Sequence, residues 1–384
     1  MSKSLRLLLG VLLLSPLALL AQGKKRPAQQ LEMTPLPAVP AMPDAFPQVV
    51  GTQVFGPAYK FTKEPAVLEA AQGISAMGSR ILKINAVSGG QLTPFIAMPF
   101  THYVLWYRSN GDWAGGLTPE LRRREYDAMY LFTKDLLTRY DTAGKTFFLG
   151  HWEGDWYLLP DKDVKKDASP ERVAAMIEWF AVRQKAVDDA RAEVPYAKCR
   201  VYTYAEVNRV RDAMKDGRRR MVNAVLPKLT VDFISYSAYD CQLLPAEEVR
   251  ATLDYVNAQV PPKAGLPAKR VFIGECGLSW QACEADGARH EQRNRELLGK
   301  LLSWRPAMVL FWQYYNNEVV AGRQVGFWLV DDRNQKTPLH ATLTGLFAAQ
   351  EEAAREMRQR ARRLPSFEEI AAFSENWLAA RGAR

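Results

Sequence analysis

The chain has few of the residues that metal and redox centres require. It contains four His and four Cys in 384 residues. No two Cys have the Cys-x-x-Cys spacing, which removes support for a zinc site or a thioredoxin-type motif. Four scattered His are also too few for the His- and Asp-rich centres of barrel metallohydrolases. We therefore predict neither a metal nor a cofactor.

Motifs for nucleotide and nucleic-acid binding are missing as well. No Gly-Lys-Ser/Thr stretch is present to cradle a phosphate, and no nucleic-acid-binding module is recognisable. The net charge of +9 comes from local basic runs spread along the chain. A solvated surface is the favoured explanation of that excess, and attraction to an anionic envelope or an acidic polymer is the alternative. We predict no nucleic-acid partner.

The N-terminal segment has the features of a targeting sequence. Residues 1–21 begin with Lys3 and Arg6, continue with the apolar run Leu7–Leu20 and end at the small residue Ala21. The run is shorter than the ~20 apolar residues of a membrane span. This pattern predicts a cleaved signal peptide, a secreted or periplasmic protein, and no stable membrane insertion after cleavage.

Export to an oxidising compartment would permit disulfides among Cys199, Cys241, Cys276 and Cys283. Four Cys allow three complete pairings, and sequence does not choose among them. Buried free thiols are the alternative.

Beyond the signal, the chain divides into three parts. Residues 22–47 are rich in Pro and predict an extended linker. Residues 48–350 alternate short β-type runs with longer helical patterns, which is typical of a parallel sheet with crossover helices. Residues 351–384 predict a helical C-terminal extension on the outside of the core. The apolar runs predict eight strands, at residues 49–55, 81–87, 103–107, 146–150, 200–204, 231–236, 270–274 and 308–313. This is the number that a closed (β/α)₈ barrel, or TIM barrel, needs.

Polar and aromatic side chains follow several of these strands. In this fold, active sites lie at the carboxyl ends of the strands. The segments that follow strands four to eight are His151–Tyr157, Tyr204–Asn208, Ser235–Asp240, Glu275–Gly277 and Trp312–Asn317. They combine carboxylates with Trp and Tyr, a combination suited to carbohydrates. Flat rings stack on sugar faces, and a pair of carboxyl groups supplies a proton donor and a nucleophile or base.

The segment VFIGECG, residues 271–277, resembles the seventh-strand motif of a large clan of retaining glycoside hydrolases built on this barrel. The resemblance implies that Glu275 is the nucleophile and that Glu153, after strand four, is the acid/base. SYSAYD resembles the clan's sixth-strand segment, whose aromatic residue would be Tyr239 or Tyr236. FWQYY resembles its eighth strand, where Trp312 would form the floor of a sugar subsite. The resemblance covers about residues 48–350 as a fold.

One position departs from the clan pattern. The residue before the acid/base is usually Asn, which binds the sugar, whereas here it is Trp152, with His151 one residue further away. Glu206 is a rival acid/base, and Asp155 is a weaker one. The predicted substrate-binding residues are His151, Trp152, Glu206, Tyr236, Tyr239 and Trp312.

Two functions fit these residues. The first is an exported glycoside hydrolase that cleaves a poly- or oligosaccharide by a retaining mechanism. The second is a non-catalytic barrel that binds glycans.

Overall fold

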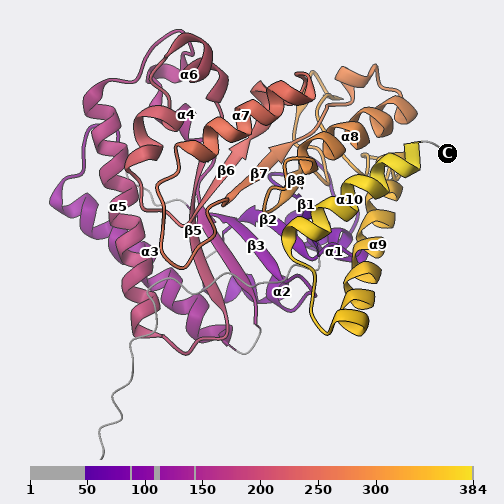
Figure 1. Ribbon diagram of the computed structural model, residues 1–384, viewed down its shortest axis with the longest axis horizontal. Helices are drawn as coiled ribbons and strands as arrows, with labels where there is room; N and C mark the ends of the chain where they lie inside the picture. Colours follow the sequence, from indigo (N-terminus) through magenta and orange to yellow (C-terminus); the bar gives the residue numbers. More distant parts are fainter. Residues whose placement is uncertain (1–47, 87–88, 108–112, 142–143, 383–384) are drawn as a thin grey trace, which may run out of the picture. The chain divides into compact units, whose positions relative to one another are not determined.

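The computed structural model describes residues 48–86, 89–107, 113–141 and 144–382. The predicted signal peptide and the Pro-rich linker lie outside these residues. Eight parallel strands pair in sequence order and close into a barrel (Figure 1). They are β1 Val50–Gln53, β2 Ile81–Asn85, β3 His102–Trp106, β4 Thr146–Gly150, β5 Arg200–Val207, β6 Phe233–Ser237, β7 Val271–Cys276 and β8 Val309–Phe311. The predicted (β/α)₈ barrel is confirmed.

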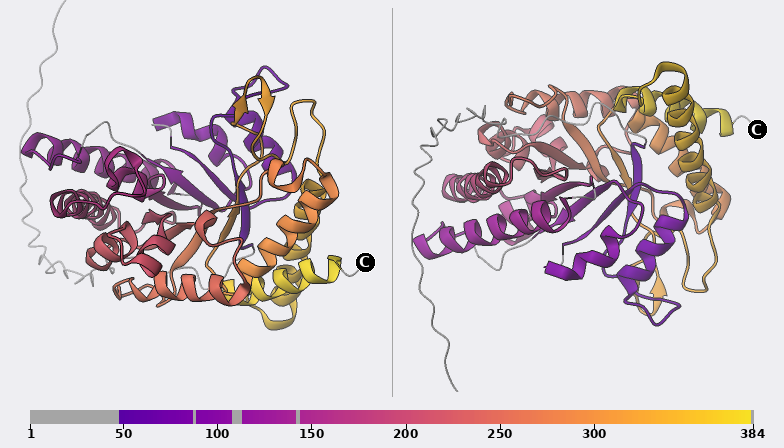
Figure 2. Two further views of the ribbon diagram at one scale, coloured as in Figure 1. Left: turned by 90° about the horizontal axis from the view of Figure 1, so that it is seen from above. Right: turned by 90° about the horizontal axis from the view of Figure 1, so that it is seen from below.

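Helices surround the strands in both views of Figure 2. The longer ones are α1 Ala66–Ala76, α3 Pro119–Arg139, α5 Pro170–Glu193, α7 Ala246–Ala258, α8 Gly287–Leu302, α9 Pro338–Ala361 and α10 Phe367–Gly382. The shorter ones are α2 Thr93–Ile96, α4 Gly154–Leu158 and α6 Val210–Asp216. Within the described ranges, none of the helices combines the length and the apolar character needed to cross a membrane.

The sequence signals explain where several helices start. Ser169 caps α5, because its hydroxyl accepts the backbone N–H of Arg172 at 3.2 Å and Pro170 occupies the first helical position. Thr118 and Thr337 cap α3 and α9 in the same way, each followed by Pro.

The sequence pattern of residues 219–228 predicts a helix, but the structure of this segment is different. The chain forms α6 at residues 210–216, which Gly217 ends with a φ of 61°, and then a single π-helical turn, η4 Met221–Val225. The short 3₁₀ turn η5 Leu226–Lys228 follows and contains Pro227. Proline removes an N–H and clashes with the preceding turn, so a continuous α-helix through this segment is disfavoured.

The C-terminal helices pack on the barrel's outer layer. Helix α9 continues to Ala361, so the predicted border at residue 350 lies inside one helix. Helix α10 lies beside α9 at the yellow end of the chain (Figure 1). Gln350 Nε2 donates to Ser374 Oγ at 2.6 Å, and Arg305 of the barrel pairs with Glu375 at 2.6 Å.

The four cysteines are buried, and the structure holds them as thiols rather than as disulfides. Of the two possibilities that the sequence left open, the structure therefore shows buried free thiols.

Alternate residues of the strands fill the barrel interior. Phe148, Tyr202, Phe233 and Phe272 form a packed aromatic layer, as expected from the two-residue period of a strand. Towards the carboxyl ends of the strands the interior becomes polar, with Lys83, Glu206 and Glu275 among the buried residues. The candidate site lies at this end of the barrel.

Candidate active site

A cleft of about 420 Å³ opens at the carboxyl ends of the strands. Glu153, from the end of β4, and Glu275, from β7, both line it. The other lining residues are Trp152, Trp156, Asn208, Arg209, Tyr239, Asp240, Trp312, Glu318 and Phe327. The predicted pair of carboxyl groups, remote in sequence, thus meets in one cleft.

A β-bulge brings Glu275 to this cleft. Ser235 and Tyr236 of β6 pair with Phe272 and Ile273, but Ser237 pairs with Glu275. The extra residue in β7 is Gly274, and a bulge of this kind changes which side chain points into the barrel. A Cβ at Gly274 would overlap the Ser235 hydroxyl and lie 2.7 Å from Glu206 Oε2. Glycine is therefore required at the bulge.

Glu153 lies at the start of α4, where three neighbours hold it. Its backbone N–H donates to Glu206 Oε1 at 2.9 Å. Its side chain accepts hydrogen bonds from Trp156 Nε1 at 2.6 Å and from the Ser237 hydroxyl. Glu153 is 8% exposed. Burial raises its pKa to about 7, and the nearby charge of Glu206 acts in the same direction. A substantial fraction of Glu153 is therefore protonated at neutral pH.

Lys83 of β2 lies beneath the cleft and links two carboxylates. Its Nζ is 3.1 Å from Glu206 Oε2 and 3.2 Å from Glu275 Oε1. It also donates to the carbonyl of Gly274 at 3.0 Å. The Lys83 side chain is fully buried, with its ammonium 4.9 Å from the Trp106 ring centroid. One buried cation thus serves two carboxylates, with Glu153 as a third acidic group nearby.

The charges of this cluster decide which carboxyl group holds a proton. Burial raises the pKa of Glu275, as do Glu206 and Glu153, while Lys83 opposes the shift. Neighbouring carboxyl groups that repel one another titrate as a unit. The ammonium of Lys83 contacts Glu275 and not Glu153. The geometry therefore favours the negative charge on Glu275 and the proton on Glu153.

The structure brings three of the predicted substrate-binding residues to the cleft, namely Trp152, Tyr239 and Trp312. The Trp312 ring stacks on Phe55, with centroids 5.5 Å apart, and on Trp106 at 6.2 Å. These contacts fix the orientation of its ring.

The other three predicted substrate-binding residues, His151, Glu206 and Tyr236, do not line the cleft. His151 is 2% exposed, and its Nε2 accepts the backbone N–H of Glu206 at 3.2 Å. The Tyr236 hydroxyl is turned to Asp240. Glu206 is completely buried, where it accepts hydrogen bonds from Ser235 at 2.6 Å and from Glu153. Glu206 therefore contacts Glu153 and Lys83 from beneath the cleft rather than lining it.

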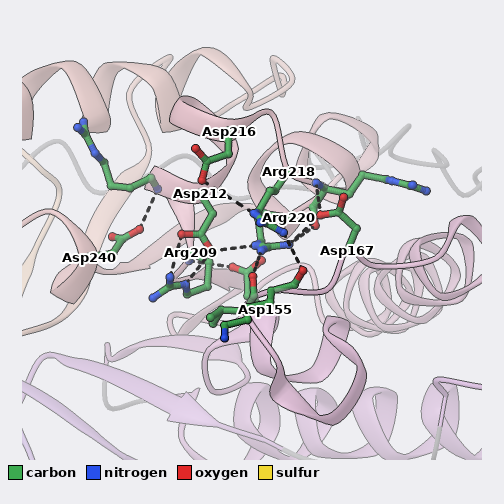
Figure 3. A network of polar contacts seen from close by, with 12 residues as sticks. Asp155, Asp167, Arg209, Asp212, Asp216, Arg218, Arg220 and Asp240 are labelled. Carbon is green, nitrogen blue, oxygen red and sulfur yellow. Dashed lines mark hydrogen bonds and ion pairs between the residues drawn. The ribbon is translucent and has the colours of Figure 1, made fainter.

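Asp155, the weaker rival, belongs to a structural network (Figure 3). Its carboxylate accepts the backbone N–H groups of Met221 at 2.7 Å and of Asn208 and Arg209 at 3.1 Å. Beside it, the fully buried Arg220 donates to Asp212 at 3.1 Å and to three backbone carbonyls. This network fixes the loop after β5, which carries Asn208 and Arg209 into the cleft.

The sequence analysis did not single out four residues in or beneath the cleft: Lys83, Arg209, Glu318 and Phe327. Lys83 could have been found from the sequence, because it is the one charged residue of the strand ILKIN, and a cation among apolar strand residues needs a buried partner. Glu318 and Phe327 come from the segment around the hairpin β9 Val319–Val320 and β10 Arg323–Gln324, and no motif marks them. Among the described residues, no group of three His, Cys, Asp or Glu side chains is arranged to hold a metal ion.

Comparisons with known proteins support the fold. No protein-family model and no curated protein sequence matches the chain. Among solved structures, it is similar to a family 39 glycoside hydrolase from the gut symbiont Bacteroides cellulosilyticus WH2, with a TM-score of 0.52 and 12% identity over 80% of this chain and 65% of that one. It therefore spans slightly less than two thirds of that protein.

A second similar structure is a GH5-4 broad specificity endoglucanase from Clostridium longisporum, with a TM-score of 0.50 and 10% identity over 78% of this chain and 96% of that one. At sequence identities this low, the structural similarity shows a shared fold alone. The resemblance to barrel glycoside hydrolases is confirmed at that level.

Proposed function

We propose that this chain is an exported glycoside hydrolase that cleaves O-glycosidic bonds of a poly- or oligosaccharide with retention of configuration. Glu153 is the acid/base and Glu275 is the nucleophile. The observation that carries this proposal is the asymmetry of the two carboxyl groups in one aromatic cleft. Burial raises the pKa of both groups, but Glu275 contacts the Lys83 ammonium, whereas the Glu153 carboxyl contacts the neutral donors Trp156 and Ser237.

In the first step, protonated Glu153 donates its proton to the leaving-group oxygen. An oxygen of Glu275 attacks the anomeric carbon, and a covalent glycosyl-enzyme forms as the glycosidic bond breaks. Lys83 holds Oε1, while no described residue donates to Oε2, which leaves Oε2 as the attacking atom. In the second step, Glu153 removes a proton from water, the water attacks the same carbon, and Glu275 departs as a carboxylate.

The aromatic residues of the cleft supply the binding surface. Trp312 would form the floor of the sugar subsite, because its ring is fixed between neighbouring rings and lines the cleft beside Glu275. Trp152 and Tyr239 add apolar surface, and the carboxyl groups of the cleft and the Asn208 amide form hydrogen bonds with sugar hydroxyl groups. Aromatic walls combined with placed polar groups are typical of small-molecule sites.

The ion pair between Lys83 and Glu275 favours a second candidate, a barrel that binds glycans without cleaving them. A buried ammonium lowers the basicity of the carboxylate it contacts, which weakens a nucleophile. Against this, Lys83 also contacts Glu206, so its positive charge is divided between two carboxylates and lowers the basicity of Glu275 less. Without the cation, Glu275 would be protonated and unable to attack.

Hydrolysis assays on a panel of aryl glycosides and polysaccharides separate the two candidates. We expect wild-type activity, a loss of about 10²–10⁴-fold in Glu153→Gln, and loss of activity in Glu275→Gln. Glu284→Gln is the matched control, since its side chain is 75% exposed, and it should retain full activity. NMR of the first-formed product should show the anomeric configuration of the substrate. Inversion would refute the assignment of Glu275, and glycan binding without hydrolysis across the panel would establish the binding barrel.

A further inference from the structure

A second cavity, of about 440 Å³, lies at the opposite end of the barrel from the cleft. Its lining includes the first residues of three adjacent strands, His102 of β3, Thr146 of β4 and Arg200 of β5. Its other wall comes from the end of α9, with Arg355 and Arg358. The cavity thus lies between the amino ends of the strands and the part of α9 that extends beyond the predicted barrel boundary.

The charges that line this cavity are strongly unbalanced. Arg80, Arg200, Arg355 and Arg358 contribute guanidinium groups, and Glu351 is the sole carboxylate of the lining. Arg80 already pairs with that carboxylate, with Nε 2.8 Å from Oε1. Burial lowers the pKa of His102 to about 4, so this imidazole is neutral at physiological pH. The residues that line the cavity therefore carry a net formal charge of +3, from four arginines and one glutamate.

Two of these arginines lack a partner within the part of the chain that the structure describes. Arg355 pairs with Glu352 on its own helix. The side chains of Arg200 and Arg358 make no ion pair or hydrogen bond with a described residue. Arg200 is held at a defined place by the barrel, because its backbone pairs with Thr146 in the sheet. Its guanidinium is thus presented to the cavity by a rigid element.

We propose that this cavity binds a phosphate or sulfate group, either as the free anion or as an ester of a small molecule. The planar guanidinium matches tetrahedral oxyanions with paired hydrogen bonds, and all four cations of the lining are arginines. A bound dianion also relieves the repulsion among the clustered positive charges. The volume lies within the range of small-ligand sites, roughly 300–1,000 Å³, so a monosaccharide phosphate would fit. This site is independent of the proposed glycosidase function.

Isothermal titration calorimetry of the full chain with glucose 6-phosphate, inorganic phosphate and glucose tests the proposal. We expect binding of the two anions, weakening as NaCl screens the charges, and no binding of glucose. Tighter binding of glucose 6-phosphate than of phosphate would identify an ester as the ligand, and equal affinities would identify the free anion. Absence of binding for both anions at low salt would overturn the proposal.

Variants locate the binding. Arg200→Met and Arg358→Met should each weaken binding by about tenfold, the effect of losing one charge-assisted contact. Arg123→Met is the matched control, because this arginine lies on α3 outside the cavity with its side chain 84% exposed, and it should bind as the wild type does. Thermal unfolding checks that Arg200→Met folds, and Arg358 lies on the exposed side of α9, where substitution leaves the core intact. Unchanged affinity in the Arg200→Met/Arg358→Met double variant would place the anion elsewhere and refute this site.

Discussion

Replacing Lys83 with Met is the most direct test of the charge cluster beneath the cleft. Methionine keeps much of the length of the side chain and removes the ammonium, so the change is chiefly electrostatic. Two buried carboxylates, Glu206 and Glu275, would lose the cation that lies 3.1 and 3.2 Å from them, and the Gly274 carbonyl would lose a donor.

The expected loss of stability is large for a single substitution. Removing one partner from a buried ion pair costs about 3–5 kcal/mol, because an uncompensated charge stays behind. The same change in an exposed pair costs roughly 0–1 kcal/mol. Lys185→Met supplies that comparison, because Lys185 pairs with Asp189 on α5 at 2.7 Å and its side chain is 68% exposed.

Urea unfolding of the wild type, Lys83→Met and Lys185→Met at several pH values measures both effects. In Lys83→Met the pKa of Glu275 rises further, because Lys83 lowers it in the wild type. A carboxyl group whose pKa is higher in the folded than in the unfolded state destabilises the fold as pH rises through these values. The difference between Lys83→Met and the wild type should therefore be largest near pH 8 and shrink towards pH 5.

A neutral or stabilising effect of Lys83→Met at pH 8 would refute this reasoning. It would mean that Glu275 is already protonated beside Lys83 in the wild type. A protonated Glu275 cannot act as the nucleophile, so the proposed mechanism would fail with it.

Three further predictions concern the cleft. The kcat/KM of the wild type should fall as pH rises through about 7, where Glu153 loses the proton it must donate, and a pH–rate profile of Glu153→Gln should lack this alkaline limb. Gly274→Ala should abolish activity and lower the free energy of unfolding in urea by about 1–3 kcal/mol, because the new Cβ overlaps Ser235. Gly299→Ala, with open space around it in α8, should instead stabilise the protein by up to about 1 kcal/mol. Equal effects of the two substitutions would contradict the steric explanation. The lining of the cleft carries four carboxyl groups and one guanidinium, which is already paired with Asp212. Aryl glucuronides should therefore be cleaved more slowly than the matched neutral glucosides. Faster cleavage of the glucuronide would show that the charge of the cleft does not select the substrate.

The barrel could be predicted from sequence because its strands are short apolar runs separated by strong helix signals. Capping residues such as Ser169 with Pro170 mark the start of α5 in the sequence. The segment after β5 was harder, since its path depends on Asp155 and Arg220, which bind backbone groups from distant parts of the chain. No local pattern reports such contacts.

The candidate site could be predicted only where a residue belongs to a motif. Glu153 and Glu275 were found because each follows or ends a strand, whereas the two-residue period alone would turn Glu275 away from the barrel interior. The bulge at Gly274 reverses that direction. His151 and Tyr236 were expected in the cleft because they lie beside or within segments that resemble the clan's motifs. Residues that are neighbours at the end of a strand, however, have side chains on different sides.

Glu206 shows why the missing residues matter for mechanism. It is a carboxylate without access to the cleft, yet it contacts the backbone N–H of Glu153 through Oε1 and the ammonium of Lys83 through Oε2. One buried group on β5 therefore contacts the proposed acid/base directly and the proposed nucleophile through Lys83. Because both contacts pass through the same side chain, the geometry and the protonation of the pair cannot be adjusted separately. The sequence analysis named Glu206 as a rival acid/base. In the structure it is buried and contacts Glu153 directly and Glu275 through Lys83.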